Sequence, residues 1–181
     1  DLASALIQHA SGVQALLLRD ETLTPIQPEK MRKLLVALRR MHDFVIVDTP
    51  SLLDDGAMAT LELADLVLLV LTPEITALRG ATFLMKRAEE AGLSRDRVMP
   101  VLNRFPQRGG LPRGAIEKAL GLPLRGVIAD DCPLVTYSIN RGVPLVESHG
   151  RSRVAQQMGE LAKGLFQVAR QEVHSLAGCE S

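Results

Sequence analysis

Two short runs of this sequence are entirely apolar, and each ends abruptly in residues that favour a turn. Phe44–Val47 is followed by Asp48-Thr49-Pro50, and Val67–Leu71 is followed by Thr72-Pro73. Continuous apolar runs of this length are typical of strands buried on both faces, as in parallel sheets covered by helices. The two runs therefore predict buried strands of a parallel sheet in an α/β fold.

Helical patterns alternate with these runs along the whole chain. We predict strands at residues 13–18, 44–47, 67–71, 98–102 and 124–128, and helices at 2–10, 28–40, 57–63, 75–91, 115–120, 134–141 and 152–175, with an extended segment at 142–146. Such alternation predicts a three-layer α-β-α sandwich with a mainly parallel sheet. No linker or repeat interrupts it, so residues 1–181 are expected to form a single domain.

Composition restricts the class of partner. Lys+Arg and Asp+Glu both number 21, so bulk charge favours no polyanion, and 3% aromatic residues argue against a base-stacking surface. Cys132 and Cys179 lie far apart, which favours a reducing cytoplasm over a disulfide framework. No apolar run approaches the length of a membrane span. The chain begins without Met on an apolar helical pattern, so we expect it to be a piece of a longer protein.

Polar residues follow the predicted strands where each strand ends. They are Asp48-Thr49, Thr72-Pro73, Asn103-Arg104 and Asp130-Asp131. In a parallel sheet these ends share one edge, which is where α/β proteins bind ligands. Carboxylates, hydroxyls and an amide at one edge suit a nucleotide with Mg²⁺, and a strand-ending acid such as Asp48 can hold Mg²⁺ through water.

Each of these residues also has a purely structural interpretation. Asp48 could cap the turn that follows it, and Asn103 could adopt a left-handed turn conformation. Arg104 could be a surface arginine, and Asp130 and Asp131 could cap the helix after Pro133. The glycine-rich phosphate cradle that such a site normally needs is missing, because no lysine directly follows a glycine.

Several motifs resemble the second half of the MinD/ParA family of P-loop ATPases. They are residues 44–50, Leu63-Ala64-Asp65 before the run at 67–70, residues 73–79, Val101-Leu102-Asn103-Arg104, and residues 139–146. In order and spacing they look most like the CpaE/TadZ branch, which is associated with Flp/Tad pilus assembly. The resemblance implies ATP and Mg²⁺ as cofactors, a homodimer, and pilus-assembly or secretion proteins as partners. It implies that the expected cytoplasmic location is polar or close to the membrane, and composition indicates no nucleic-acid partner.

The resemblance also implies roles for individual residues. Asp48 would be the Walker B carboxylate, with the catalytic role, and would act on Mg²⁺ through water. Asn103 would contact the adenine edge, and the loop from Ala129 to Pro133 would pack beside the base. Arg104, Asp130 and Asp131 are then further cofactor-binding candidates.

The family domain would begin earlier, with a central P-loop strand next to the Walker B strand. Without it the sheet would have two unpaired interior edges, which favour aggregation. We therefore expect an upstream segment, and ATP hydrolysis only if its P-loop is intact. Two alternatives remain: a tyrosine-kinase-like domain, although the single tyrosine, Tyr137, lies inside the domain and not in a tail, and a nucleotide-independent localisation scaffold.

Overall fold

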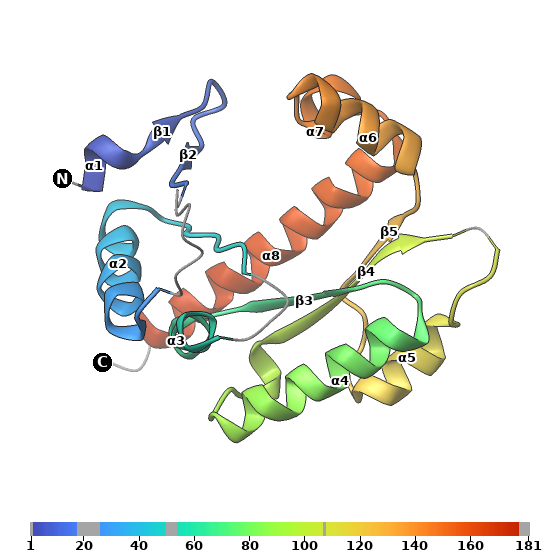
Figure 1. Cartoon of the computed structure of the whole chain (residues 1–181), viewed down its shortest axis with the longest axis horizontal. Helices are drawn as coiled ribbons and strands as arrows, with labels where there is room; N and C mark the ends of the chain where they lie inside the picture. The colour runs from blue at the N-terminus through green and yellow to red at the C-terminus, as the bar shows by residue number, and fades with distance from the viewer. Residues whose placement is uncertain (1, 18–25, 50–53, 107, 178–181) are drawn as a thin grey trace.

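The sheet consists of three parallel strands, as the apolar runs predict. The computed structural model describes residues 2–17, 26–49, 54–106 and 108–177. Within them, β3 (Val67–Leu71), β4 (Val98–Phe105) and β5 (Gly126–Ala129) lie in the order β3-β4-β5 (Figure 1). In register, Leu71 lies opposite Leu102 of the central strand, and Leu102 opposite Val127.

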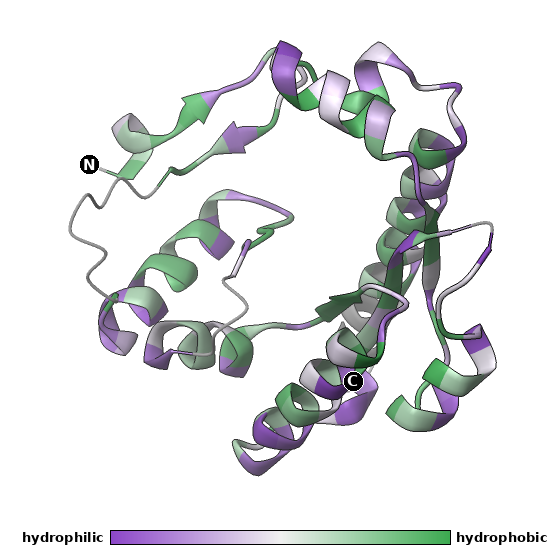
Figure 2. Ribbon diagram, turned by 45° about the vertical axis from the view of Figure 1, so that its right-hand side comes forward, coloured by the Kyte–Doolittle hydropathy of each residue, from purple (hydrophilic) through white to green (hydrophobic). Residues whose placement is uncertain are grey.

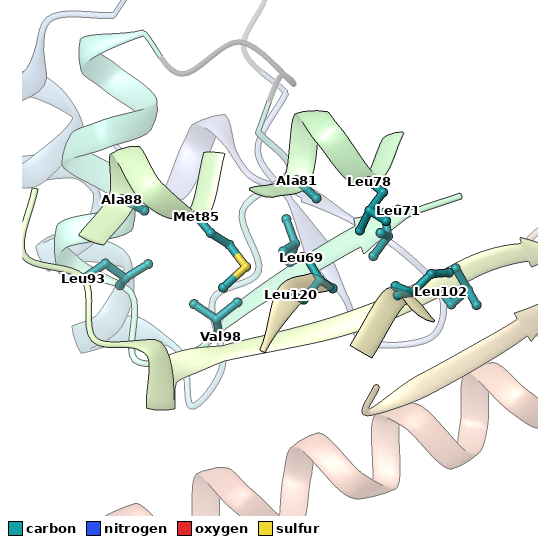
Figure 3. Packing of buried hydrophobic residues seen from close by; sticks show 11 residues of the cluster. Leu69, Leu71, Leu78, Ala81, Met85, Ala88, Leu93, Val98, Leu102 and Leu120 are labelled. Carbon is teal, nitrogen blue, oxygen red and sulfur yellow. The ribbon is translucent and has the colours of Figure 1, made fainter. Parts of the chain in front are cut away.

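One face of the sheet is covered by α4 (Ile75–Glu90) and α5 (Arg113–Leu120), which form the main hydrophobic core with β3 and β4. Figure 3 shows the side chains of α4 and of the two strands pointing toward one another. Leu102 and Ile116, at the centre of this core, are both 0% exposed. The amphipathic pattern of α4 therefore places its apolar side on the sheet, as predicted.

The opposite face is covered by α8 (Arg153–Ala177) together with the short helix α7 (Leu145–Ser148). The backbone of β5 approaches α8 closely, since a Cβ on Gly126 would lie 3.0 Å from Leu161. This contact completes the three-layer α-β-α arrangement. Neither helix covers β3, where Leu68 is 39% and Val70 57% exposed. In Figure 2 the strands of the main sheet are mainly hydrophobic, whereas the helices carry both hydrophobic and hydrophilic residues.

A second, smaller core joins α2 (Pro28–Met41) to α3 (Asp55–Leu63) through Met31, Leu35 and Ala59. Arg32 of α2 also links the two helices, because it donates to Glu62 of α3 at 2.7 Å. Within α2 it donates to Glu29 at 2.7 Å. The hydrogen bond to Glu62 is the main reason that the pKa of Arg32 is raised. Asp54 caps α3, since its carboxylate accepts from the Ala57 amide at 2.7 Å.

The prediction of a buried strand at Phe44–Val47 is wrong for this structure. Residues 44–49 have no regular secondary structure, and Ile46 is 92% exposed. A strand needs neighbours for its backbone N–H and C=O groups, and among the described residues no strand pairs with this segment. Phe44 instead contacts Phe166 of α8, with ring centroids 5.2 Å apart.

The first residues also differ from the prediction. The expected helix at 2–10 is limited to α1 (Leu2–Ala5), and the expected strand at 13–18 to β2 (Gln14–Ala15), which pairs antiparallel with β1 (Ile7–Gln8). Residue 18 lies outside the described part. Both views place this hairpin away from the main sheet (Figures 1 and 2), and two paired residues cannot form a stable strand unit alone.

Smaller differences concern element ends. Strand β4 continues to Phe105 instead of ending at residue 102, and β5 begins at Gly126 instead of 124. The extended segment predicted at 142–146 contains the start of α7. α6 (Cys132–Arg141) begins two residues early, and Gly142 ends it in the left-handed conformation, with φ +64°.

Candidate nucleotide-binding edge

The carboxyl ends of β3, β4 and β5 lie at one edge of the sheet and bring Thr72, Asn103 and Asp130 together. Thr72 follows the Leu71–Leu102 pair directly, so it lies level with Asn103. Asp130 is tied to β4, because its amide donates to the Phe105 carbonyl at 3.1 Å. The parallel register thus confirms that these three strand ends share an edge, which is the usual ligand edge of such sheets.

β4 is irregular at this edge, and the irregularity changes how its last residues are oriented. Pairing with β5 shifts between Leu102 and Phe105, and Arg104 takes a positive φ of +51°. The side-chain oxygen of Asn103 accepts a hydrogen bond from the Arg104 amide at 2.9 Å. The residue in the left-handed conformation is therefore Arg104, not Asn103. A strained backbone held this way is more common at functional sites than elsewhere.

The two adjacent acids after β5 have different environments. The carboxylate of Asp131 accepts from the Leu134 amide at 3.3 Å and caps α6, as the structural interpretation expects. Asp130 is exposed, and no side-chain hydrogen bond or ion pair involves it in the part of the chain that the structure describes. Of the two, Asp130 is thus the one with a carboxylate available to a ligand.

The loop before α5 and the first residue of α5 carry exposed arginines, Arg108 and Arg113, and the loop backbone is held against the end of β3. The Leu111 amide donates to the Pro73 carbonyl at 2.8 Å, and a Cβ on Gly110 would lie 3.2 Å from Pro73. The guanidinium of Arg113 lies 4.9 Å from the centre of the Phe105 ring. The only sequence signal for this packing is the pair Gly109-Gly110, both at φ +79°.

Within the described ranges, no strand pairing fixes the position of Asp48 relative to this edge. Asp48 is exposed and lies in the irregular segment 44–49. In the described part of the chain, no group of three His, Cys, Asp or Glu residues could hold a metal ion. Since the sequence also has no Gly-Lys phosphate cradle, the residues present fit the base side of a nucleotide and do not by themselves fit its triphosphate with Mg²⁺.

Comparison with known proteins identifies sequence relatives of this chain. The chain is 30% identical over 127 residues to a putative septum site-determining protein MinD of Emiliania huxleyi (67% of this chain, 46% of the relative). It is 29% identical over 143 residues to MinD of Thermotoga maritima (76% of this chain, 52% of the relative). The chain thus spans about half the length of these relatives. No protein-family model matches it.

Solved structures agree with these relatives. MinD from Pyrococcus horikoshii, complexed with Mg-ADP, superposes with a TM-score of 0.76 at 26% identity, covering 100% of this chain and 72% of that one. A ParA-family ATPase from Chlorobium tepidum gives 0.79 at 23% identity, covering 91% of this chain and 68% of that one, and supports the fold alone. The parallel sheet and its ligand edge therefore define an α/β fold of the P-loop NTPase type. Within that class, the chain is homologous to MinD/ParA-family P-loop ATPases.

Proposed function

We propose that residues 1–181 form the C-terminal part of one MinD/ParA-like domain that binds ATP with Mg²⁺. The observation that carries the proposal is the shared edge at which Thr72, Asn103 and Asp130 follow three parallel strands. The Mg-ADP complex of the Pyrococcus horikoshii relative supports the choice of nucleotide.

Each candidate residue has its own role in this proposal. Asn103 has an amide side chain suited to the adenine edge, and its present bond to the Arg104 amide leaves the side-chain NH₂ group free of that contact. Asp130 is exposed at the next strand end. Arg104 is exposed on the strained turn, and Asp131 holds the adjoining loop by capping α6. Asp48 is the proposed Walker B carboxylate and acts on Mg²⁺ through water.

An upstream segment completes the domain in this proposal by placing a P-loop strand between residues 44–48 and β3. The uncovered residues Leu68 and Val70 on β3, and Ile46 at 92% exposure, are apolar surface that such a strand and its helix would bury. That segment would also carry the phosphate cradle that this chain lacks.

At the cellular level we propose a homodimer that positions other machinery, with Flp/Tad pilus assembly, at a polar or membrane-proximal location, as the favoured role. The CpaE/TadZ-like motif at 139–146 supports this branch. The MinC:MinD complex of Aquifex aeolicus is an example of a similar fold that acts with a protein partner. None of the described helices is both long and apolar enough to cross a bilayer.

The test compares nucleotide binding of the chain preceded by its upstream segment with that of matched variants. Asn103→Ala is expected to weaken binding of a fluorescent ATP analogue roughly tenfold, because a buried polar edge of the base loses its partner. Asp48→Asn is expected to abolish the Mg²⁺ dependence of binding. Asn140→Ala, which changes an exposed asparagine on α6, is the control. The proposal fails if the longer chain binds no ATP, or if Asn103→Ala and Asn140→Ala behave alike.

A nucleotide-independent scaffold is the second candidate, favoured by the absence of any Gly-Lys pair from this sequence. It predicts self-association that does not respond to ATP. Sedimentation velocity with and without ATP and Mg²⁺ separates the two functions, because the ATPase proposal requires nucleotide to increase the dimer fraction.

A further inference from the structure

A polar cleft lies at the far end of α6 from the nucleotide-binding edge. It has a volume of about 340 Å³ and is lined by residues of α6 and of the segment that carries α7: Tyr137, Ser138, Arg141, Val143, Ser148 and His149. The edge is at the start of α6, where Asp131 caps the helix. Because α6 rises about 1.5 Å per residue, Arg141 lies ~14 Å along the axis from Cys132. The cleft is thus a separate site.

Two of the six lining residues hold the walls of the cleft in place. The Ser138 hydroxyl donates to the Val143 carbonyl, and the Ser148 hydroxyl donates to the Pro144 carbonyl at 3.1 Å. Both hydroxyl protons are therefore committed to the backbone. The donors left for a ligand are on Tyr137, Arg141 and His149.

Arg141 and Tyr137 form a hydrogen-bonded pair that still has donors available to a ligand. A guanidinium N–H of Arg141 donates to the Tyr137 hydroxyl oxygen at 2.8 Å, and its central carbon lies 5.5 Å from the ring centroid. Because that oxygen accepts from Arg141, the phenolic hydrogen remains available to another acceptor. None of the ion pairs among the described residues involves Arg141, so its charge has no carboxylate partner there.

His149 contributes an unsatisfied polar atom to the same cleft. Its ring meets Tyr137 edge-on, with centroids 5.9 Å apart and planes at 79°. The Nδ1 atom is buried, and it has no hydrogen-bond partner in the described part of the chain. Buried polar atoms are nearly always paired, so this nitrogen, in a residue that lines the cleft, has a hydrogen bond that the described residues do not supply. Glu147, the nearest acid in sequence, lies 4.0 Å from His9.

We propose that this cleft binds a tetrahedral oxyanion of the phosphate or sulfate type. Arg141 supplies the positive charge and further N–H donors, Tyr137 its hydroxyl hydrogen, and His149 an Nδ1–H. Three donors of this kind around one cleft match the acceptors of an oxyanion, and guanidinium groups bind such groups with charge-assisted hydrogen bonds. The proposal does not depend on nucleotide binding at the sheet edge.

Isothermal titration of the 181-residue chain with sodium phosphate, at an ionic strength held constant with sodium chloride, tests the site. Saturable binding is expected. Arg141→Gln should weaken it at least about tenfold, because a charge-assisted pair is lost. Tyr137→Phe and His149→Phe, which keep the ring packing, should each weaken it roughly threefold. Arg87→Gln, an equal change of charge on an exposed residue of α4, is the control and should stay within about twofold, the loss expected from a distant, solvent-screened charge.

Four outcomes would overturn the proposal. The first is no saturable phosphate binding by the unmodified chain. The second is an equal loss with Arg141→Gln and Arg87→Gln, which would indicate nonspecific charge. The third is loss with Arg104→Gln but not with Arg141→Gln, which would place the anion at the sheet edge. Acetate serves as the competing carboxylate, and binding as tight as that of phosphate would contradict a tetrahedral site. Circular dichroism measures whether each variant is folded. If Arg141→Gln does not fold, Tyr137→Phe and His149→Phe still test the site, because they keep the ring packing.

Discussion

Asp130 and Asp131 are adjacent and chemically identical, yet the fold gives them different tasks. The carboxylate of Asp131 caps α6 through the Leu134 amide, whereas Asp130 is exposed after the end of β5. The difference arises because Asp131, at φ −145° and ψ 61°, occupies the N-cap position, from which a side chain can reach the amides of the first helical turn. At the scale of single residues, one acid is structural and the other is free for a ligand.

This assignment predicts different stabilities for two alanine variants. Asp131→Ala should lower the free energy of unfolding by about 1 kcal/mol, the usual cost of a lost N-cap. Asp130→Ala should change it by less than about 0.5 kcal/mol, as for exposed residues without partners. Urea denaturation measures both values. Equal losses would mean that the cap is not specific to Asp131.

Gly56 and Gly80 provide a second matched pair, since both lie inside helices. A Cβ on Gly56 would lie 2.9 Å from the Ile26 carbonyl oxygen, whereas a Cβ on Gly80 would meet nothing within 4 Å. Glycine to alanine in an open helix position stabilises by roughly 0.5–1 kcal/mol. We expect that gain for Gly80→Ala and a loss of about 1–3 kcal/mol for Gly56→Ala, because the backbone oxygen cannot move away cheaply. Thermal unfolding of both variants measures these effects. A higher melting temperature for Gly56→Ala would contradict the prediction.

At the scale of elements, the face of β3 that neither α7 nor α8 covers contributes less to stability than the core face of the central strand β4. Leu102 is 0% exposed between two helical layers, whereas Leu68 on β3 is 39% exposed. Leu102→Ala should therefore cost about 2–5 kcal/mol of unfolding free energy, as for other buried leucines. Leu68→Ala should cost less, about 1–2 kcal/mol, because a leucine that is 39% exposed loses contact with water over only part of its apolar area on folding. Guanidinium denaturation distinguishes the two, and similar losses would show that β3 is covered in solution.

Elements defined by local pattern could be predicted from the sequence, and elements that depend on distant partners could not. The strand at Val67–Leu71 and the helix starting at Pro28 begin where the pattern places them. The run at Phe44–Val47 has an equally strong pattern, but it forms no strand because the described chain offers none to pair with it. Apolar sequence makes a strand favourable only when both its edges and its faces are covered.

The candidate site likewise has features that the sequence predicts and features that it does not. That Asn103 and Asp130 share an edge follows from strand order and direction, which the alternating pattern predicts. The left-handed Arg104 and the contact of Arg113 with Phe105 do not follow from it, since both arise from how β4 and the loop at 108–112 are held in the finished fold. Asp48 remains a predicted site residue whose placement depends on a sheet larger than the one formed here.

At the scale of the whole molecule, the chain has a surface that an ordinary complete domain would bury. Ile46 at 92%, Phe44 at 54% and Val70 at 57% exposure are apolar side chains of segments that pattern assigns to a sheet interior. Apolar side chains that are exposed where the sequence pattern expects a sheet interior are candidates for an interface. The proposed upstream strand and helix account for it, because they would lie between residues 44–48 and β3.

The effect of Ile46→Ser on stability should depend on whether the proposed upstream segment is present. In the 181-residue chain, Ile46→Ser should change the free energy of unfolding by less than about 0.5 kcal/mol, because the side chain is already exposed to water. In the chain preceded by its upstream segment, the same substitution should cost at least about 2 kcal/mol, since it removes buried apolar area and buries a hydroxyl. Ile139→Ser, at a position that is 71% exposed on α6, controls for the change of residue type and should have a small effect in both contexts. Urea denaturation of the four variant proteins against their parents gives the comparison. If Ile46→Ser remains neutral in the longer chain, the segment ending in Asp48 is not an interior strand, and its carboxylate loses the position from which it would reach Mg²⁺.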